Sequence, residues 1–198
     1  MSAIGVAAKQ NWLECLFPRR DGRYLTVTAV AALSAVAGLF YAAPSPWLWP
    51  ALGGFSIWSS LISAGDAVTQ RIPNLLNLAA LCSAWPLLAL ATAAGPGSLS
   101  GAGMGAAAAF FLYLALWLVA PTSIGMGDVK LAPYLGAHLG YFGLSCWWHG
   151  LFYGLIVQGG VAGIGLAAGK LRRGDRVAHG PAMCLGAAAA LLEALLGR

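Results

Sequence analysis

The sequence predicts an all-α fold, a polytopic bundle of membrane-spanning helices. Composition is the first reason: 60% of the 198 residues are hydrophobic and only 9% are charged, whereas a soluble domain carries roughly 25% charged residues. Such a chain has too little polar surface to cover a globule in water, so lipid is its natural solvent. The second reason is that the apolar runs are long and continuous. Strands of a membrane barrel alternate in segments of about 10 residues, so helices are expected.

Seven spans are expected from the apolar runs. The connections between them are short and hold most of the proline and polar residues, which leaves no room for a separate soluble domain. The fifth run is short and interrupted by glycine. The expected spans are about 24–43, 47–65, 74–94, 101–120, 129–145, 147–169 and 179–196.

The basic residues predict the orientation of these spans, because cytoplasmic loops carry an excess of Lys and Arg. With the N-terminus in the cytoplasm, the outer side holds only Arg198. The net charge of +5 therefore reflects membrane topology and does not indicate a nucleic-acid partner. The inner side holds Lys9, Arg19, Arg20, Arg23, Arg71, Lys130, Lys170, Arg172, Arg173 and Arg176.

The cysteines and glycines have structural interpretations. The four cysteines are far apart and form no CxxC pair, which disfavours a zinc site and a disulfide framework. Glycine-rich stretches at 101–105 and 159–169 are expected to let helix backbones approach closely in lipid.

Two of the six acidic residues differ from the rest. Asp66 and Asp128 each lie at the inner end of an apolar span, on the same face of the membrane. Considered singly, Asp66 could end a helix and Asp128 could be a helix N-cap. Ionisable groups at membrane depth are costly, however, and default to functional hypotheses. Two carboxylates that converge share a proton, so that one acts as base and the other as acid.

The residues around these aspartates resemble a known family. GMGDVKL at 125–131 matches the Gly-x-Gly-Asp-x-Lys-Leu motif of the type IV prepilin peptidases, which are GxGD membrane aspartyl proteases. Asp66 is followed six residues later by Ile72, Pro73 and Asn74, as in that family's first motif. HGPAMCLG at 179–186 supplies a Gly-Pro pair, Gly180 and Pro181, that opens the last span.

The resemblance implies that Asp66 and Asp128 are the catalytic pair. Family members cut the leader from prepilin-like or pseudopilin substrates at the cytoplasmic face of the inner membrane, without a metal or an organic cofactor. Larger members also methylate the new N-terminus and carry an insert with paired CxxC motifs. This chain lacks both pairs, so peptidase activity without methyltransferase activity is expected. Short members of this kind often serve Tad-type pili.

The smallest members of that family have a six-helix core. Here the core is expected at residues 47–198, and residues 1–46 add a cytoplasmic segment and one extra N-terminal transmembrane helix. The extra helix moves the N-terminus into the cytoplasm and leaves both aspartates on the inner face.

The remaining motif residues are expected to support the pair. Gly125 and Gly127 would permit backbone conformations barred to other residues. Pro73 suits the first turn of a helix, and Asn74 could hydrogen-bond across its loop. Lys130 lies two residues from Asp128, a spacing that faces away on a helix, so it is expected to reach lipid phosphate.

Helix dipoles predict which aspartate carries the charge. Asp66 follows the negative end of its helix, which disfavours an ionised carboxylate, whereas Asp128 begins a helix, where N–H groups favour one. The dipoles therefore predict Asp128 as the base and Asp66 as the acid.

Other functions account for less of the sequence. A proton-coupled transporter also uses paired carboxylates, but near the bilayer midplane. A non-catalytic scaffold has no use for both aspartates, and a presenilin-like protease pairs GxGD with a Tyr-Asp motif that Gly65 breaks here. The scattered polar residues lack metal-ligand spacing and are expected to make interfacial or interhelical hydrogen bonds; they are His138, His149, His179 and Gln158.

Overall fold

The computed structural model describes residues 38–197, apart from 94, 96, 122, 170, 171 and 173–176. The described residues form helices and contain no strand, which confirms the all-α membrane bundle. A short helical piece at 38–42 and the 3-10 helix η1 (Pro46–Leu48) lead into six long helices. These are α3 (Trp49–Thr69), α4 (Asn74–Thr92), α5 (Leu99–Val119), α6 (Met126–Phe142), α7 (Leu144–Ala167) and α8 (Gly180–Leu196).

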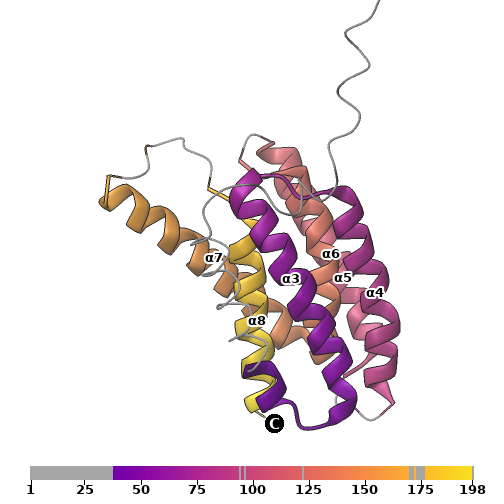
Figure 1. Cartoon of the computed structure of the whole chain (residues 1–198). Coiled ribbons are helices and arrows are strands. Elements are labelled where there is room, and N and C mark those ends of the chain that lie inside the picture. Colours follow the sequence, from indigo (N-terminus) through magenta and orange to yellow (C-terminus); the bar gives the residue numbers. More distant parts are fainter. Residues whose placement is uncertain are drawn as a thin grey trace, which may run out of the picture.

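The last six expected spans each correspond to one of these helices. Among the described residues, α4, α5 and α7 are long and apolar enough to cross a membrane, and α8 is apolar but shorter. The first expected span, 24–43, lies mostly outside the described residues. Successive helices run in opposite directions, so the end of α3 and the starts of α4, α6 and α8 lie at one end of the bundle (Figure 1).

Glycines allow the backbones of α5 and α6 to lie in direct contact. A Cβ on Gly105 would meet the Gly136 carbonyl and the Gly140 backbone, and a Cβ on Gly140 would meet the Gly101 carbonyl. The two helices can therefore approach until their backbones touch, which strengthens dispersion contacts in lipid. The packing role expected for the glycines at 101–105 is confirmed, and α6 is fixed against α5.

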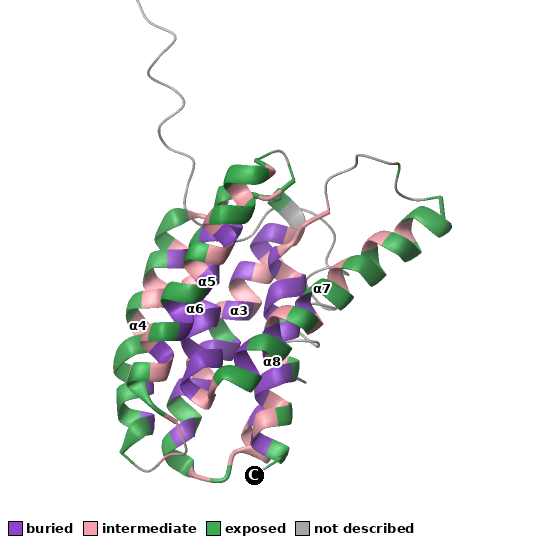
Figure 2. Ribbon diagram, turned by 180° about the vertical axis from the view of Figure 1, so that it is seen from behind, coloured by how far each residue is buried: buried purple, intermediate pink, exposed green. Residues whose placement is uncertain are grey.

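Helix α7 begins at a sharp corner and then leaves the bundle. Gly143 separates it from α6 with a φ of 120°, a conformation open to glycine and rare for other residues. The first half of α7 packs on α8, while the second half leans away and is mostly exposed (Figure 2). A Cβ added to Gly159, Gly160 or Gly163 would meet no atom within 4 Å. The close packing expected for these three glycines was therefore wrong within this chain.

Candidate active site

Asp66 lies inside α3, in its last turn, and is only 6% exposed. The expectation that the helix stops before Asp66 was wrong, because α3 continues to Thr69 and ends at Gln70, whose φ is 51°. The Asp66 carboxylate crosses to another helix: its Oδ2 accepts a hydrogen bond from the backbone N–H of Gly180 at 2.9 Å.

Gly180 is the first residue of α8, and Pro181 follows it in the first turn. N–H groups in the first turn of a helix have no partner within the helix, and Pro181 has no N–H to offer. A Cβ on Gly180 would lie 2.8 Å from Oδ2 of Asp66. The Gly-Pro pair therefore combines a free donor with the space that a buried carboxylate needs to reach it.

Asp128 lies in the first turn of α6 and is 7% exposed. The N-cap of this helix is Gly125, not Asp128 as the sequence suggested, and Asp128 occupies the third helical position. Its Oδ2 accepts a hydrogen bond from the Gly125 N–H at 3.2 Å. A carboxylate at this position reaches back over the helix start and satisfies a backbone donor there.

The two carboxylates lie close enough to interact electrostatically. Both are buried, and each accepts a hydrogen bond from a backbone N–H at the start of a helix. Two nearby negative charges away from water repel strongly, so a single negative charge shared by the pair is favoured. The arrangement is suited to one proton-accepting and one proton-donating carboxyl group.

Helix dipoles act on both aspartates in the same direction at their carboxylates. Asp66 does lie near the negative end of α3, but its carboxylate also contacts the positive N-terminal end of α8 through Gly180. Asp128 likewise contacts the N-terminal end of α6. Since each carboxylate receives an N-terminal helix donor, dipoles no longer rank one above the other.

The Ile-Pro-Asn element contacts the GxGD element directly. Lys130 Nζ donates to Oδ1 of Asn74 at 2.8 Å, so the exposed lysine has a partner within the protein, and its expected contact with lipid phosphate stays a prediction. A Cβ on Gly127 would lie 3.2 Å from the Ile72 side chain. The two motifs, far apart in the sequence, thus fix the start of α4 against the start of α6, which carries Asp128.

Two backbone expectations need correction. Gly125 has an ordinary extended backbone with φ of −78° and ψ of 145°, and the positive-φ glycines among the described residues are Gly143 and Gly169. The GxGD glycines are therefore explained by close approach and not by unusual dihedral angles. Pro73 is the N-cap of α4, one residue before the first turn where it was expected.

Sequence reasoning missed Asn77, which is buried within α4. Its Nδ2 donates to the carbonyl of Gly127 at 3.2 Å, while its Oδ1 is buried without a hydrogen-bond partner among the described residues. An amide side chain within an apolar run, one turn after Asn74, is unusual enough to have indicated a buried hydrogen bond. Asn77 adds a second hydrogen bond between α4 and the GxGD turn.

Buried polar side chains continue from the aspartates into the bundle. Cys184 of α8 interacts electrostatically with both aspartates and lies near Ser59 and Ser63 of α3, although the buried Ser59 hydroxyl has no hydrogen-bond partner among the described residues. Ser59 and Ser63 precede Asp66 by seven and three residues on α3, so the three side chains lie along one face of the helix. No pattern in the sequence indicated this cluster, because cysteine and serine are ordinary residues of membrane helices.

The histidines make hydrogen bonds of the expected kind in two of three cases. His149 bonds to Glu193 of α8 at 3.1 Å, and His179 bonds to Tyr113 of α5 at 3.2 Å. His138 is buried and bonds within its own helix, to the Tyr134 carbonyl at 2.9 Å. No group of three or more metal-ligating side chains occurs in the part of the chain that the structure describes.

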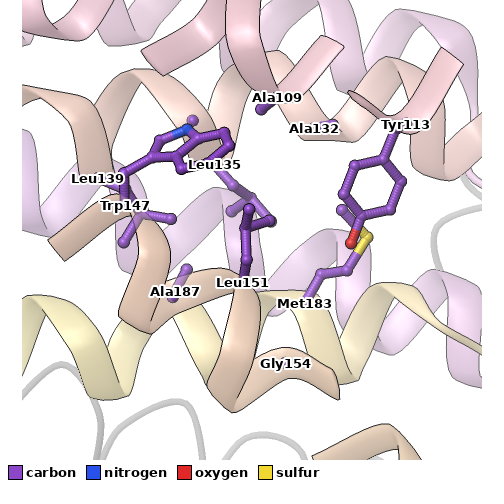
Figure 3. A pocket seen from close by; sticks show the side chains of 12 residues that line it. Ala109, Tyr113, Ala132, Leu135, Leu139, Trp147, Leu151, Gly154, Met183 and Ala187 are labelled. Atoms are coloured by element: carbon purple, nitrogen blue, oxygen red, sulfur yellow. The ribbon is translucent and has the colours of Figure 1, made fainter. Parts of the chain in front are cut away.

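A small apolar cavity lies between α5, α6, α7 and α8, with Tyr113 at one end and Trp147 at the other (Figure 3). Its volume of about 20 Å³ is room for roughly one water molecule. Leucine, alanine and glycine form most of its wall. A side chain larger than a methyl group does not fit there unless the helices move, so the cavity is not a preformed pocket for a large substrate side chain.

The contact between Lys130 and Asn74 leads to a prediction about stability. Removing either side chain in Lys130→Ala or Asn74→Ala breaks the same exposed hydrogen bond, so the double variant is expected to lose less than the sum of the single losses. The interaction should be about 1 kcal/mol. Thermal unfolding in detergent measures it, and strictly additive losses would contradict a direct bond.

Comparisons with known proteins agree with the motifs. A family model described as the type IV leader peptidase family matches residues 53–168. Two curated proteins from Burkholderia pseudomallei, strains 1026b and K96243, are each described as prepilin leader peptidase/N-methyltransferase. Each is 32% identical over 185 residues, covering 85% of this chain and 54% of the relative. The chain thus spans about half the length of these relatives. No solved structure gives a significant match.

Proposed function

Because this chain belongs to the type IV leader peptidase family, we propose that it is a membrane aspartic endopeptidase that removes the leader of type IV prepilin-like proteins. The observation that carries the proposal is the pair of buried, interacting carboxylates, Asp66 and Asp128, at one end of the helix bundle. A proton relay through the membrane would need carboxylates distributed towards the bilayer midplane, whereas these two lie together near helix ends.

The pair provides acid and base for peptide hydrolysis. The ionised carboxylate accepts a proton from a water molecule, whose oxygen then attacks the carbonyl carbon of the scissile peptide. The protonated carboxyl group donates to the carbonyl oxygen as the tetrahedral intermediate forms. Collapse of that intermediate breaks the C–N bond: the carboxyl group that took the proton from water donates it to the leaving nitrogen, and the other carboxylate takes a proton back from a hydroxyl group of the intermediate. The Gly180 and Gly125 N–H groups hold the carboxylates in place during these steps.

The proposal extends to the scope of the reaction. The relatives' description includes N-methyltransferase, but the four cysteines of this chain contain no CxxC pair. We therefore propose cleavage without methylation, and no requirement for a cofactor.

The proposed setting is the inner membrane. The aspartates would face the cytoplasm, where Arg71 and the other basic loop residues lie by the positive-inside rule. The partners would be the lipid bilayer and a prepilin or pseudopilin. Residues 47–198 would form the peptidase core, with residues 1–46 as an addition to it.

Co-expression with a prepilin tests this function. The chain should convert the prepilin to a shorter form on a gel, and mass spectrometry should find a free, unmethylated amino group at the new N-terminus. Purified protein in proteoliposomes should cleave the same substrate without added metal. An unprocessed prepilin in both assays, together with proton flux through the proteoliposomes, would favour the transporter instead.

Gly180 provides a prediction about the geometry of the site. In Gly180→Ala the new Cβ would lie 2.8 Å from Oδ2 of Asp66, so the carboxylate must move from its N–H donor. Cleavage is expected to fall about 10-fold or more, the effect of losing one hydrogen bond to a charged group. Gly65→Ala is the matched control, because a Cβ there meets no atom within 4 Å. Equal activity in the two variants would contradict the role given to Gly180.

A further inference from the structure

Tyr113 of α5 and His179, the N-cap of α8, form a polar pair beside the aspartates. The Tyr113 hydroxyl lies 3.2 Å from Nε2 of His179, and the two ring centroids are 6.0 Å apart. Tyr113 is buried, and a buried phenol hydroxyl without a partner is costly. The proposed hydrolysis gives neither side chain a chemical step.

This pair is connected to both aspartates. Tyr113 interacts electrostatically with Asp128. His179 and Gly180 share one peptide group, whose N–H donates to Oδ2 of Asp66 at 2.9 Å. Because a peptide group is planar and contains the Cα atoms of both flanking residues, a displacement of His179 also moves that N–H.

The imidazole of His179 bonds across the bundle and not to its own helix. An N-cap side chain commonly accepts a hydrogen bond from its own helix, but His179 makes no such bond. Helix α5 packs mainly on α6, while α8 packs mainly on α7 and also contacts α3 and α6. The bond from Tyr113 to His179 adds a polar link from α5 to the start of α8, where the Gly180 N–H holds Asp66.

We propose that Tyr113 and His179 are positioning residues, whose hydrogen bond fixes the first peptide group of α8 so that Gly180 holds Asp66 towards Asp128. The kinetic consequence rests on the proposed peptidase function, while the geometric consequence does not. According to its tautomer, Nε2 of a neutral imidazole either accepts a hydrogen bond from the phenol hydroxyl or donates one to the phenol oxygen. Either tautomer maintains the link.

Tyr113→Phe removes one oxygen and keeps the ring, so it tests the bond with little change in packing. With purified protein and prepilin in detergent, kcat is expected to fall about 10-fold while KM stays within about twofold, because the bond acts on the aspartates and not on substrate binding. Tyr153→Phe is the matched control. Its hydroxyl also joins two helices, through Glu193 at 2.7 Å, and its loss should leave both constants unchanged.

Substitutions of His179 separate positioning from general loss of structure. His179→Gln keeps a polar group that can reach Tyr113 and is expected to retain most of the activity, whereas His179→Leu should lose about as much as Tyr113→Phe. The double variant Tyr113→Phe/His179→Leu should be little worse than either single variant, since both remove one bond. A loss of kcat in the double variant equal to the product of the two single losses would overturn the proposal. A change in KM alone would also overturn it.

Infrared spectroscopy gives a readout that needs no activity. The Asp66 carboxyl band, identified by its loss in Asp66→Asn, is expected to shift in Tyr113→Phe and to stay unchanged in Tyr153→Phe. A chain that cleaves no prepilin would refute the proposed function, and this band would still decide the positioning role. An Asp66 band that is the same in wild type and Tyr113→Phe would overturn it.

Discussion

Replacing either Asp66 or Asp128 with asparagine is expected to abolish cleavage of a prepilin leader, with a loss of about 1000-fold or more. Asparagine keeps the shape of the side chain but can neither accept a proton from water nor donate one as a carboxylic acid does. Because the two groups act on one water molecule and one carbonyl group, the double variant should be little worse than either single variant. A gel shift of co-expressed prepilin measures the processing.

The control for this result is a carboxylate elsewhere in the bundle. Glu193 is about half exposed and bonds to His149, so Glu193→Gln removes a charge of the same kind away from the aspartates and should leave cleavage intact. Abundance of the Asp66→Asn and Asp128→Asn proteins should match wild type, since asparagine keeps the shape of the side chain and an oxygen that can accept the same backbone N–H. Wild-type processing by either aspartate variant would refute the catalytic assignment.

Features that depend on the residues of a single helix could be predicted from the sequence. Long apolar runs predicted the six described helices, because burial of a backbone in lipid requires each helix to be continuous. Asp66 and Asp128 could be singled out because carboxylates are rare in such runs. Their location on the same face of the membrane followed from counting spans, since an even number of crossings between Asp66 and Asp128 returns the chain to that face.

Contacts between distant helices could not be predicted in this way. The bond from Gly180 to Asp66 joins residues 114 positions apart, and it depends on the rotation of α8 about its own axis. Apolar residues surround a membrane helix on all sides, so the pattern gives no direction for its inner face. For the same reason, Tyr113 and Asn77 had no visible partners in the sequence.

The glycines show the same limit. Small residues at 101–105 and at 159–169 looked equivalent in sequence, yet Gly105 meets the α6 backbone while Gly159 meets nothing within 4 Å. A small residue permits close approach, but only the neighbouring helix decides whether an approach occurs. The distinction matters for function, because α6 carries Asp128 and is placed by its contact with α5.

Gly136→Ala is therefore expected to destabilise the protein by about 3 kcal/mol, whereas Gly159→Ala should be neutral or slightly stabilising. Alanine is the better helix former by about 1 kcal/mol, so propensity alone predicts a gain at both positions. At Gly136, however, the added Cβ meets the Gly105 carbonyl and lies 2.6 Å from the Cβ of Ala109. Overpacking of this kind forces the helices apart at a cost that exceeds the gain.

Thermal unfolding in detergent and protein abundance in membranes measure this difference. Gly136→Ala should lower both and should also lower cleavage, because Asp128 moves with α6. It should thereby differ from Asp128→Asn, which removes cleavage at unchanged abundance. Adding Gly105→Ala to Gly136→Ala should cost less than the two changes made separately, since both separate the same pair of helices. Equal stability of the Gly136→Ala and Gly159→Ala proteins would contradict backbone contact between α5 and α6.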